Sequence, residues 1–312
     1  MKQAQSVPTG MLKPVGLGTA FSLERFAPSA DLGGFVLRYW TVAWDVPEQV
    51  PYTQDTLPYP CVNLVVERGR SGIFGVNTRR FRVQLVGKSW VFGIKFRPGA
   101  FYPFYRAPIA ALTDRAISLD AVFGAAGTEY ERRVLACASV DEMIDCAEQF
   151  LRARLPPPDE HIALINTVVE QIAADGAIVR VAEIADRVGV SQRTLQRLFG
   201  QYVGVGPKWV IQRYRLLEAA DQLAGNANVD LSSLAQALGY FDQAHFINDF
   251  RATVGSTPAE YTQRRDEPQT RPSAATIAGE RPGTGHPSCP SRNLPARPSR
   301  GQQGCSITGR RK

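Results

Sequence analysis

The feature that most constrains the fold is a phrase that occurs twice in the last third of the chain. Both copies contain an Ala, a Gly, a Phe, a second Gly and a Pro in the same order: Ala185, Gly189, Phe199, Gly204 and Pro207, then Ala235, Gly239, Phe250, Gly255 and Pro258 about fifty residues later. A small residue at a helix crossing, a turn-closing Gly and an apolar anchor in the next helix are what a helix-turn-helix requires. The repeat therefore predicts two such units, which together read two successive segments of a DNA groove.

Amphipathic spacing and end signals predict a helical domain around these phrases. Pro207 and Pro258 suit the first turn of a helix, where a missing N–H costs nothing, and Ser191 and Asp230 are suitable N-caps. The expected helices are Glu160–Ala174, Val181–Val188, Ser191–Tyr202, Pro207–Ala224, Leu231–Leu238, Asp242–Thr253 and Pro258–Arg264. The linker helix from Pro207, about 27 Å long at 1.5 Å per residue, holds the two units roughly one DNA turn, about 34 Å, apart.

The first half of the chain has a different pattern. Aromatic and β-branched runs predict strands at Phe35–Trp44, Cys61–Glu67, Phe81–Val86 and Ser89–Phe96. Helices are expected at Ser118–Phe123, Glu129–Ala138 and Ser139–Leu155, and Pro156, Pro157 and Pro158 then form a stiff spacer. We predict an α+β chain in four parts: an amino-terminal regulatory or sensor domain (1–155; β-rich over 20–106, helical over 115–155), a Pro-rich linker (156–159), an all-α domain of two helix-turn-helix units joined by a linker helix (160–265), and a disordered basic tail (266–312).

Composition excludes several classes of protein. No apolar run approaches the roughly 20 residues of a membrane helix, and residues 1–12 lack the pattern of a secretory signal, so we expect a cytoplasmic protein without a membrane partner. The five Cys residues form no CxxC pair and no cluster with zinc spacing, which predicts reduced thiols, no metal and no cofactor. Much of the net charge of +7 lies in the tail, where it either adds non-specific contacts with phosphates or has no role.

Charge separates the two helix-turn-helix units. Between Asp186 and Glu218 every charged residue is basic: Arg187, Arg193, Arg197, Lys208, Arg213 and Arg215. A stripe of cations without acids is suited to phosphates and base edges. From Ala219 to Gln263 the only Lys or Arg is Arg251, against five acidic residues. We therefore expect the second unit to bind DNA more weakly, through apolar or amide contacts.

Each unit has a predicted recognition helix with one buried side and one exposed side. Leu195, Leu198 and Phe199 are expected to point inward in the first unit, and Phe246 and Phe250 in the second. The residues expected to project toward DNA are Gln192, Arg193, Gln196 and Arg197 in the first helix, and Gln243, Ala244, Ile247 and Asn248 in the second. Arg bonds guanine and Gln bonds adenine, with about 1–3 kcal/mol of discrimination per good pair. His245 is expected either to contact a phosphate or base, or to pack against the linker helix.

These motifs also resemble a known family. In the first unit the resemblance rests on Ala185-x3-Gly189-x-Ser191 and Leu195-x3-Phe199. In the second unit it rests on Gly239-Tyr240-x-Asp242-x2-His245-Phe246-x3-Phe250-Arg251-x3-Gly255-x2-Pro258-x2-Tyr261. Over about residues 160–265 they are similar to an AraC-type DNA-binding domain. The resemblance implies a sequence-specific transcription regulator, with base contacts at Arg193, Gln196, Arg197, Gln243 and Ile247. Asn248-Asp249 departs from the family pattern, in which a basic residue precedes this Phe. In the first half, phrases at Leu57–Leu64, Gly93–Gly99 and Leu112–Arg115 resemble an amino-terminal module that precedes AraC-type domains.

Three functions are compatible with these patterns. The first is a transcription regulator, either activator or repressor, that binds double-stranded DNA and is modulated by a small-molecule effector or a partner of the amino-terminal domain. Its further candidate partners are RNA polymerase and a second copy of the chain. The second is an enzyme, a DNA-repair methyl acceptor that uses Cys61; a zinc-activated acceptor needs several Cys ligands close together, and Cys61 stands alone in the sequence. The third is an architectural DNA binder without an effector. We expect the first function, and no catalytic residue.

Overall fold

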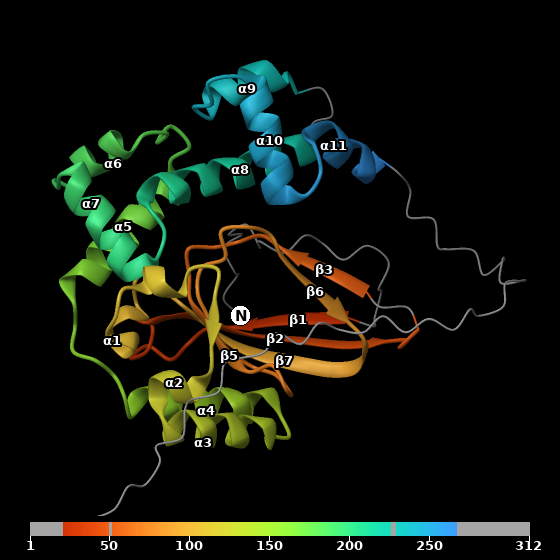
Figure 1. Cartoon of the computed structure of the whole chain (residues 1–312), viewed down its shortest axis with the longest axis vertical. Coiled ribbons are helices and arrows are strands. Elements are labelled where there is room, and N and C mark those ends of the chain that lie inside the picture. The colour runs from red at the N-terminus through yellow and green to blue at the C-terminus, as the bar shows by residue number, and fades with distance from the viewer. Residues whose placement is uncertain (1–20, 50–51, 226–228, 267–312) are drawn as a thin grey trace, which may run out of the picture. The chain divides into compact units, whose positions relative to one another are not determined.

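Figure 1 shows a computed structural model of the chain, which describes residues 21–49, 52–225 and 229–266. The chain divides into two compact units, Met1–Arg271 and Pro272–Lys312, and the second lies outside the described residues. The predicted tail lies outside them as well from residue 267 onward. In the described residues of Met1–Arg271 the expected α+β fold is confirmed, because a β-rich region is followed by helices. Below, "first unit" and "second unit" refer to the two helix-turn-helix units.

A six-stranded antiparallel sheet forms the amino-terminal region. Its strand order is β1-β2-β7-β4-β5-β8, and β3 and β6 form a separate two-stranded ribbon. The bounds are β1 Phe21–Phe26, β2 Val36–Val46, β3 Tyr52–Thr56, β4 Asn63–Val66, β5 Gly72–Phe74, β6 Phe81–Leu85, β7 Gly87–Phe96 and β8 Ala116–Ile117. Strands β2, β4, β6 and β7 coincide with predicted runs. The other strands were not predicted, because they are short or, like β3, rich in polar residues.

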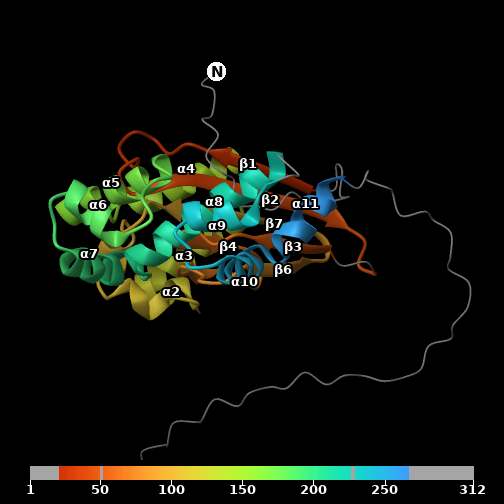
Figure 2. The same ribbon diagram turned by 90° about the horizontal axis from the view of Figure 1, so that it is seen from above.

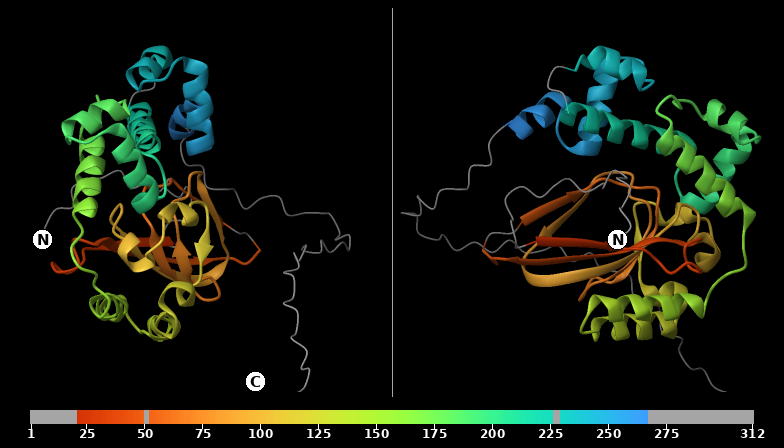
Figure 3. Two further views of the ribbon diagram at one scale, coloured as in Figure 1. Left: turned by 60° about the vertical axis from the view of Figure 1, so that its left-hand side comes forward. Right: turned by 180° about the vertical axis from the view of Figure 1, so that it is seen from behind.

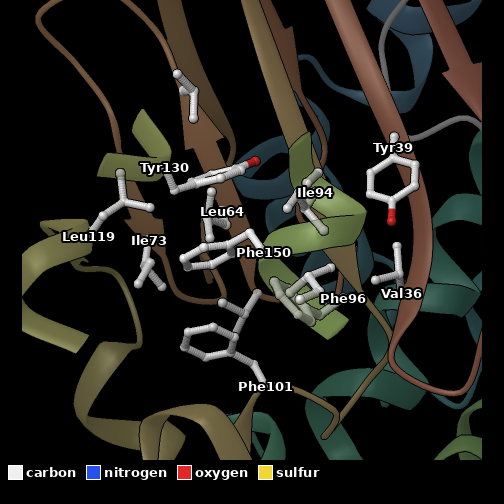
Figure 4. Close-up of a cluster of buried hydrophobic side chains, with 14 of the residues drawn as sticks. Val36, Tyr39, Leu64, Ile73, Ile94, Phe96, Phe101, Leu119, Tyr130 and Phe150 are labelled. Atoms are coloured by element: carbon white, nitrogen blue, oxygen red, sulfur yellow. The ribbon is translucent and has the colours of Figure 1, made fainter. Parts of the chain in front are cut away.

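One face of the sheet is covered by helices. Side chains alternate along a strand, so Tyr39 of β2 and Phe92 and Ile94 of β7 share this face, where all three are fully buried. The covering helices are α2 (Leu119–Phe123), α3 (Ala125–Leu135) and α4 (Val140–Arg152), on the opposite side from the β3–β6 ribbon (Figure 3). They supply Tyr130 and Phe150, which stack with ring centroids 4.3 Å apart in the core drawn in Figure 4. The other face of the sheet packs against the ribbon, where Val42 and Trp44 share a buried cluster with Leu85.

The remaining helices are arranged around α8. The bounds are α1 Tyr102–Tyr105, η2 Ile109–Leu112, α5 Glu160–Ala174, α6 Val181–Arg187, α7 Gln192–Leu198, η3 Phe199–Val203, α8 Pro207–Gly225, α9 Leu231–Ala237, α10 Gln243–Val254 and α11 Pro258–Asp266. Helix α8 runs between α5–α7 and α9–α11 (Figures 1 and 2). Its residues Ile211 and Tyr214 belong to the core of the first unit, and Leu217 and Leu223 to that of the second. None of the described helices combines the length and the apolar content that spanning a membrane takes.

Candidate nucleic-acid interface

The first helix-turn-helix consists of α6 and α7. Ala185 is buried where the two helices meet, and Gly189 adopts the left-handed conformation, with φ of 70°, that closes the turn. Ser191 then caps α7, since its hydroxyl accepts a hydrogen bond from the backbone N–H of Thr194 at 3.1 Å. The turn geometry expected from the repeated phrase is therefore present in this copy.

Helix α7 has the expected buried and exposed sides. Leu195, Leu198 and Phe199 lie in the core of the first unit. The residues predicted to face DNA, namely Gln192, Arg193, Gln196 and Arg197, are all exposed. Their contacts with bases stay a prediction, but nothing within the described part of the chain covers them.

The predicted cationic stripe is only partly correct. Arg213 and Arg215 of α8 are buried, with 3% and 2% of their surfaces exposed. Arg215 donates hydrogen bonds to the carbonyl of Ile172 and to Glu218. Both arginines lie on sides of α8 that pack against the two cores, so they are unable to reach a DNA phosphate.

The other four cations of the stripe remain at the surface. Arg187 is engaged by Asp175, with 2.6 Å between guanidinium nitrogen and carboxylate oxygen. Arg193, Arg197 and Lys208 are exposed, and within the described residues none of them forms an ion pair. The exposed cationic surface of the first unit is therefore smaller than the sequence indicated and lies on and beside α7.

Helix α7 is extended and tied to the amino-terminal region. It continues into the π-helical turn η3, which ends at Gly204 with a φ of 97°. The carbonyl of Gly204 accepts a hydrogen bond from the hydroxyl of Thr113 at 2.7 Å, and the hydroxyl of Tyr102 accepts one from the amide of Gln201 at the same distance. Sequence reasoning missed these contacts, although Thr113 lies within a phrase that resembles the amino-terminal module.

The second helix-turn-helix consists of α9 and α10. Gly239 closes its turn with a φ of 79°. Asp230 caps α9, and Asp242 caps α10 by accepting a hydrogen bond from the backbone N–H of His245 at 2.7 Å. Ala235 is buried at the helix crossing, as Ala185 is in the first copy. Both copies of the repeat therefore fold in the same way.

The exposed side of α10 differs from that of α7. Phe246 and Phe250 are fully buried, whereas Gln243, Ala244 and Asn248 are exposed. Ile247 was expected to face outward, but it is only half-exposed because it packs against the core of the second unit.

Three further residues lie in or next to α10. His245 is exposed and lies edge-on to the ring of Tyr240, with centroids 5.3 Å apart. Phe241, which precedes the cap of α10, is 92% exposed, and sequence reasoning did not single it out. Asp249 accepts a hydrogen bond from the Tyr240 hydroxyl at 2.6 Å, so the acid that departs from the family pattern has a structural partner.

Cys61, the candidate methyl acceptor, is 3% exposed. Burial raises the pKa of its thiol above the usual value. A methyl acceptor reacts as a thiolate and must be reached by a base on DNA. The burial of Cys61 therefore argues against that alternative.

Two segments of the chain match protein families. Residues 184–264 match a family described as a helix-turn-helix domain, and these residues hold both units described above. Residues 24–118 match a family described as a domain of unknown function (DUF6597), which covers nearly all of the six-stranded sheet and the β3–β6 ribbon.

Several known proteins are similar to the helical region. Over 83 residues the chain is 36% identical to the transcriptional activator RhaS of Escherichia fergusonii, which covers 27% of this chain and 30% of RhaS. Over 88 residues it is 30% identical to the transcriptional regulator ExsA of Pseudomonas aeruginosa, covering 28% and 31%. A solved transcriptional regulator with an AraC-type DNA-binding domain from Chromobacterium violaceum is 29% identical, with 34% of this chain and 95% of that chain covered and a TM-score of 0.31. The chain thus spans about 30% of the length of the curated relatives it matches.

Proposed function

We propose that the chain is a sequence-specific DNA-binding transcription regulator with an AraC-type helix-turn-helix domain at residues 184–264. Its recognition helices α7 and α10 read two adjacent segments of the major groove. One observation carries this proposal: both copies of the repeated phrase fold into a capped helix with buried Phe anchors and an exposed amino-terminal face. That is the part of a recognition helix that enters the groove.

The length of α8 supports simultaneous binding by both units. At 19 residues it is about 28 Å long, which is close to one DNA turn of about 34 Å. Apolar side chains from α8 enter the cores of both units, so the helix acts as a rigid spacer. The two recognition helices therefore engage one face of the duplex.

The two units contribute unequally to binding. Arg193, Arg197 and Lys208 give the first unit free cations, and charge-assisted contacts to phosphates supply a large part of protein–DNA affinity. The exposed face of α10 offers the amides of Gln243 and Asn248 and the methyl of Ala244. We assign affinity mainly to the first unit, and additional sequence preference to the second.

The amino-terminal region modulates this activity in our proposal. Its residues Val76 and Ala100 pack in the same core as Leu198 and Phe199 of the recognition helix and its extension. A ligand or partner that shifts the amino-terminal region therefore acts on the seating of α7. Candidate partners beyond DNA are a small-molecule effector, RNA polymerase and a second copy of the chain.

The test is to determine the operator and its footprint with the full chain. Selection from a random oligonucleotide pool, followed by DNase I protection, is expected to give two protected segments about one helical turn apart on the same face of the DNA. A reporter gene behind the selected site then shows whether transcription rises or falls. Protection confined to half a turn, or no preference over random sequence, would refute the proposal.

A further inference from the structure

The sheet and the β3–β6 ribbon line a partly open cavity of about 210 Å³. Because side chains alternate along each strand, the sheet face opposite α2–α4 provides one side of its wall, and the ribbon and loops provide the rest. At about 30 Å³ per water in the liquid, the cavity has room for a small organic molecule. All of its lining residues lie between Leu23 and Lys95, and all except Leu23 belong to the segment that matches the domain of unknown function.

Three basic side chains line one part of this cavity. Arg38 of β2 and Lys95 of β7 are directly opposite each other in the antiparallel pairing. Arg25 of β1 is the third. Within the described residues none of the three forms an ion pair. Their mutual repulsion makes this a site that favours an anion.

Acidic residues do not neutralise this cluster. The single Asp or Glu among the lining residues is Glu67. Its carboxylate lies 3.5 Å from Arg70, which also lines the cavity, so that pair is balanced internally. The positive charge of Arg25, Arg38 and Lys95 is therefore not neutralised by an acidic lining residue.

Another part of the wall is apolar, whereas Gln54, Thr56 and Asn63 add polar groups elsewhere. Trp40, Val42 and Trp44 of β2 line the cavity together with Phe74 and Val91. A Cβ atom at Gly93 would come within 2.1 Å of the Trp40 indole, so glycine is what allows this ring to lie across the neighbouring strand. An aromatic or aliphatic group placed here would be surrounded by ring faces and branched side chains, as small-molecule sites generally are.

We propose that this cavity binds a small apolar carboxylate, with its carboxylate group between Arg25, Arg38 and Lys95 and its aromatic or short aliphatic body against Trp40 and Trp44. The positive charge of the three basic residues favours an anion. The apolar part of the wall favours an organic anion over a bare inorganic ion. Burial and the two arginines lower the pKa of Lys95 to about 8, which is the shift expected of an ammonium group without its counter-ion.

A series of side-chain contacts connects this site to the linker helix α8. The ammonium of Lys95 lies 4.1 Å from the ring centroid of Tyr59, which also lines the cavity. Tyr59 also makes a T-shaped ring contact with Tyr214 of α8, with centroids 5.7 Å apart. Leu57 packs in the core of the second unit. A carboxylate that draws Lys95 away from Tyr59 therefore acts on the segment that touches α8; this regulatory role rests on the proposed function, whereas ligand binding does not.

The test is isothermal titration calorimetry on the full chain without DNA. The probes are phenylacetate, its neutral isostere phenylacetamide, and inorganic phosphate. Phenylacetate is expected to bind with a stoichiometry of one, and both other probes at least tenfold more weakly. Equal binding of phenylacetamide, or binding of phosphate alone, would overturn the proposed ligand class.

Variants locate the bound probe. Lys95→Met and Arg38→Met are expected to lower phenylacetate affinity about tenfold or more, because each removes a charge-assisted contact. Lys95→Arg keeps the charge and is expected to retain most of the affinity. Lys88→Met is the matched control, since Lys88 lies on the same strand with 82% of its side chain exposed. If phenylacetate binds Lys95→Met and Arg38→Met as it binds the unaltered chain, the site is elsewhere and the proposal fails.

Two controls separate folding and function from ligand binding. Thermal unfolding of each variant without ligand shows whether it is folded, and quenching of tryptophan fluorescence, which Trp40→Phe should reduce, reports binding in this cavity. Operator affinity is measured separately with and without phenylacetate. Ligand binding with no operator refutes the proposed function only, and operator binding with no carboxylate site refutes this inference only.

Discussion

Two clusters of basic side chains in the described part of the chain form no ion pairs with acidic residues, and they differ in what surrounds them. Arg193, Arg197 and Lys208 stand in water on and beside the first recognition helix. Arg25, Arg38 and Lys95 line a cavity between the sheet and the β3–β6 ribbon; Arg38 and Lys95 are half-buried there, whereas Arg25 is exposed. Exposed cations attract any polyanion and are screened by salt. Cations at a confined, apolar site are screened less, and they select one small anion by the shape of the wall. In our two proposals the same residue types serve different recognition tasks, because Arg38 and Lys95 are half-buried whereas Arg193 and Arg197 are exposed.

The largest expected effect is on DNA binding by the exposed cluster. We expect Arg193→Ala combined with Arg197→Ala to lower operator affinity about 100-fold or more, since each lost base or phosphate contact costs about 1–3 kcal/mol. Fluorescence anisotropy on the selected operator measures this loss. Gln243→Ala with Asn248→Ala is the counterpart in the second unit and should cost less. Equal losses in the two double variants would contradict the assigned asymmetry, and phenylacetate affinity should be unchanged in both.

The cavity cluster should respond to pH. The groups that face Lys95 are Arg25, Arg38, Tyr59 and Cys61. Arginine stays charged over the range considered, and burial raises the pKa of both Tyr59 and Cys61. The pKa of Lys95 is lowered to about 8, so its positive charge is present below pH 8 and is lost as the pH rises through 8.

We therefore expect phenylacetate affinity to fall about tenfold between pH 7 and pH 9, following the protonated fraction of Lys95. Calorimetry at several pH values measures this. The control is Lys95→Arg, whose charge does not titrate in this range, so its profile should be flat. A steep profile in Lys95→Arg would show that a group other than Lys95 controls binding.

Added salt is expected to weaken DNA binding by the exposed cluster more than ligand binding by the cavity cluster. Each phosphate contact contributes about 0.9 to the slope of log affinity against log salt concentration. Lys208→Ala is expected to reduce this slope by about one contact, which is roughly a threefold smaller loss of operator affinity between 50 and 200 mM salt. Arg132→Ala, which removes an exposed cation of α3 that pairs with Glu129, is the control and should leave the slope unchanged. Phenylacetate affinity should depend on salt much less than operator affinity does.

Sequence periodicity was sufficient to predict the helices of the helical region. The repeated phrase predicted both units, and the exposed and buried sides of α7 follow from the 3.6-residue period. The charge count along α8 was misleading, because that helix packs against two cores and has apolar residues around much of its circumference. Arg213 and Arg215 therefore look like surface cations in the sequence and are buried in the structure.

The cavity had no comparable signal in the sequence. Arg25, Arg38 and Lys95 lie on three strands, and β1 was not predicted. Only the pairing of Arg38 with Lys95 across β2 and β7 brings their charges together. The requirement for Gly93 beneath Trp40 likewise depends on strand register, which alternation within single strands does not specify.

Arg213 is a third kind of cation, and the smallest effect on recognition is expected there. Its Nε and Nη2 atoms are buried without hydrogen-bond partners among the described residues, and burial lowers its pKa to about 10. Replacing a poorly compensated buried charge by an apolar side chain is often neutral or stabilising. We expect Arg213→Met to leave operator affinity and its salt slope unchanged, and to keep or raise the free energy of unfolding by about 1 kcal/mol in urea titrations. Arg193→Met is the exposed counterpart and should do the reverse, weakening operator binding without changing stability. A loss of operator affinity in Arg213→Met with intact stability would mean that the buried arginine reaches DNA. It would contradict the assignment of DNA binding to the exposed cations alone.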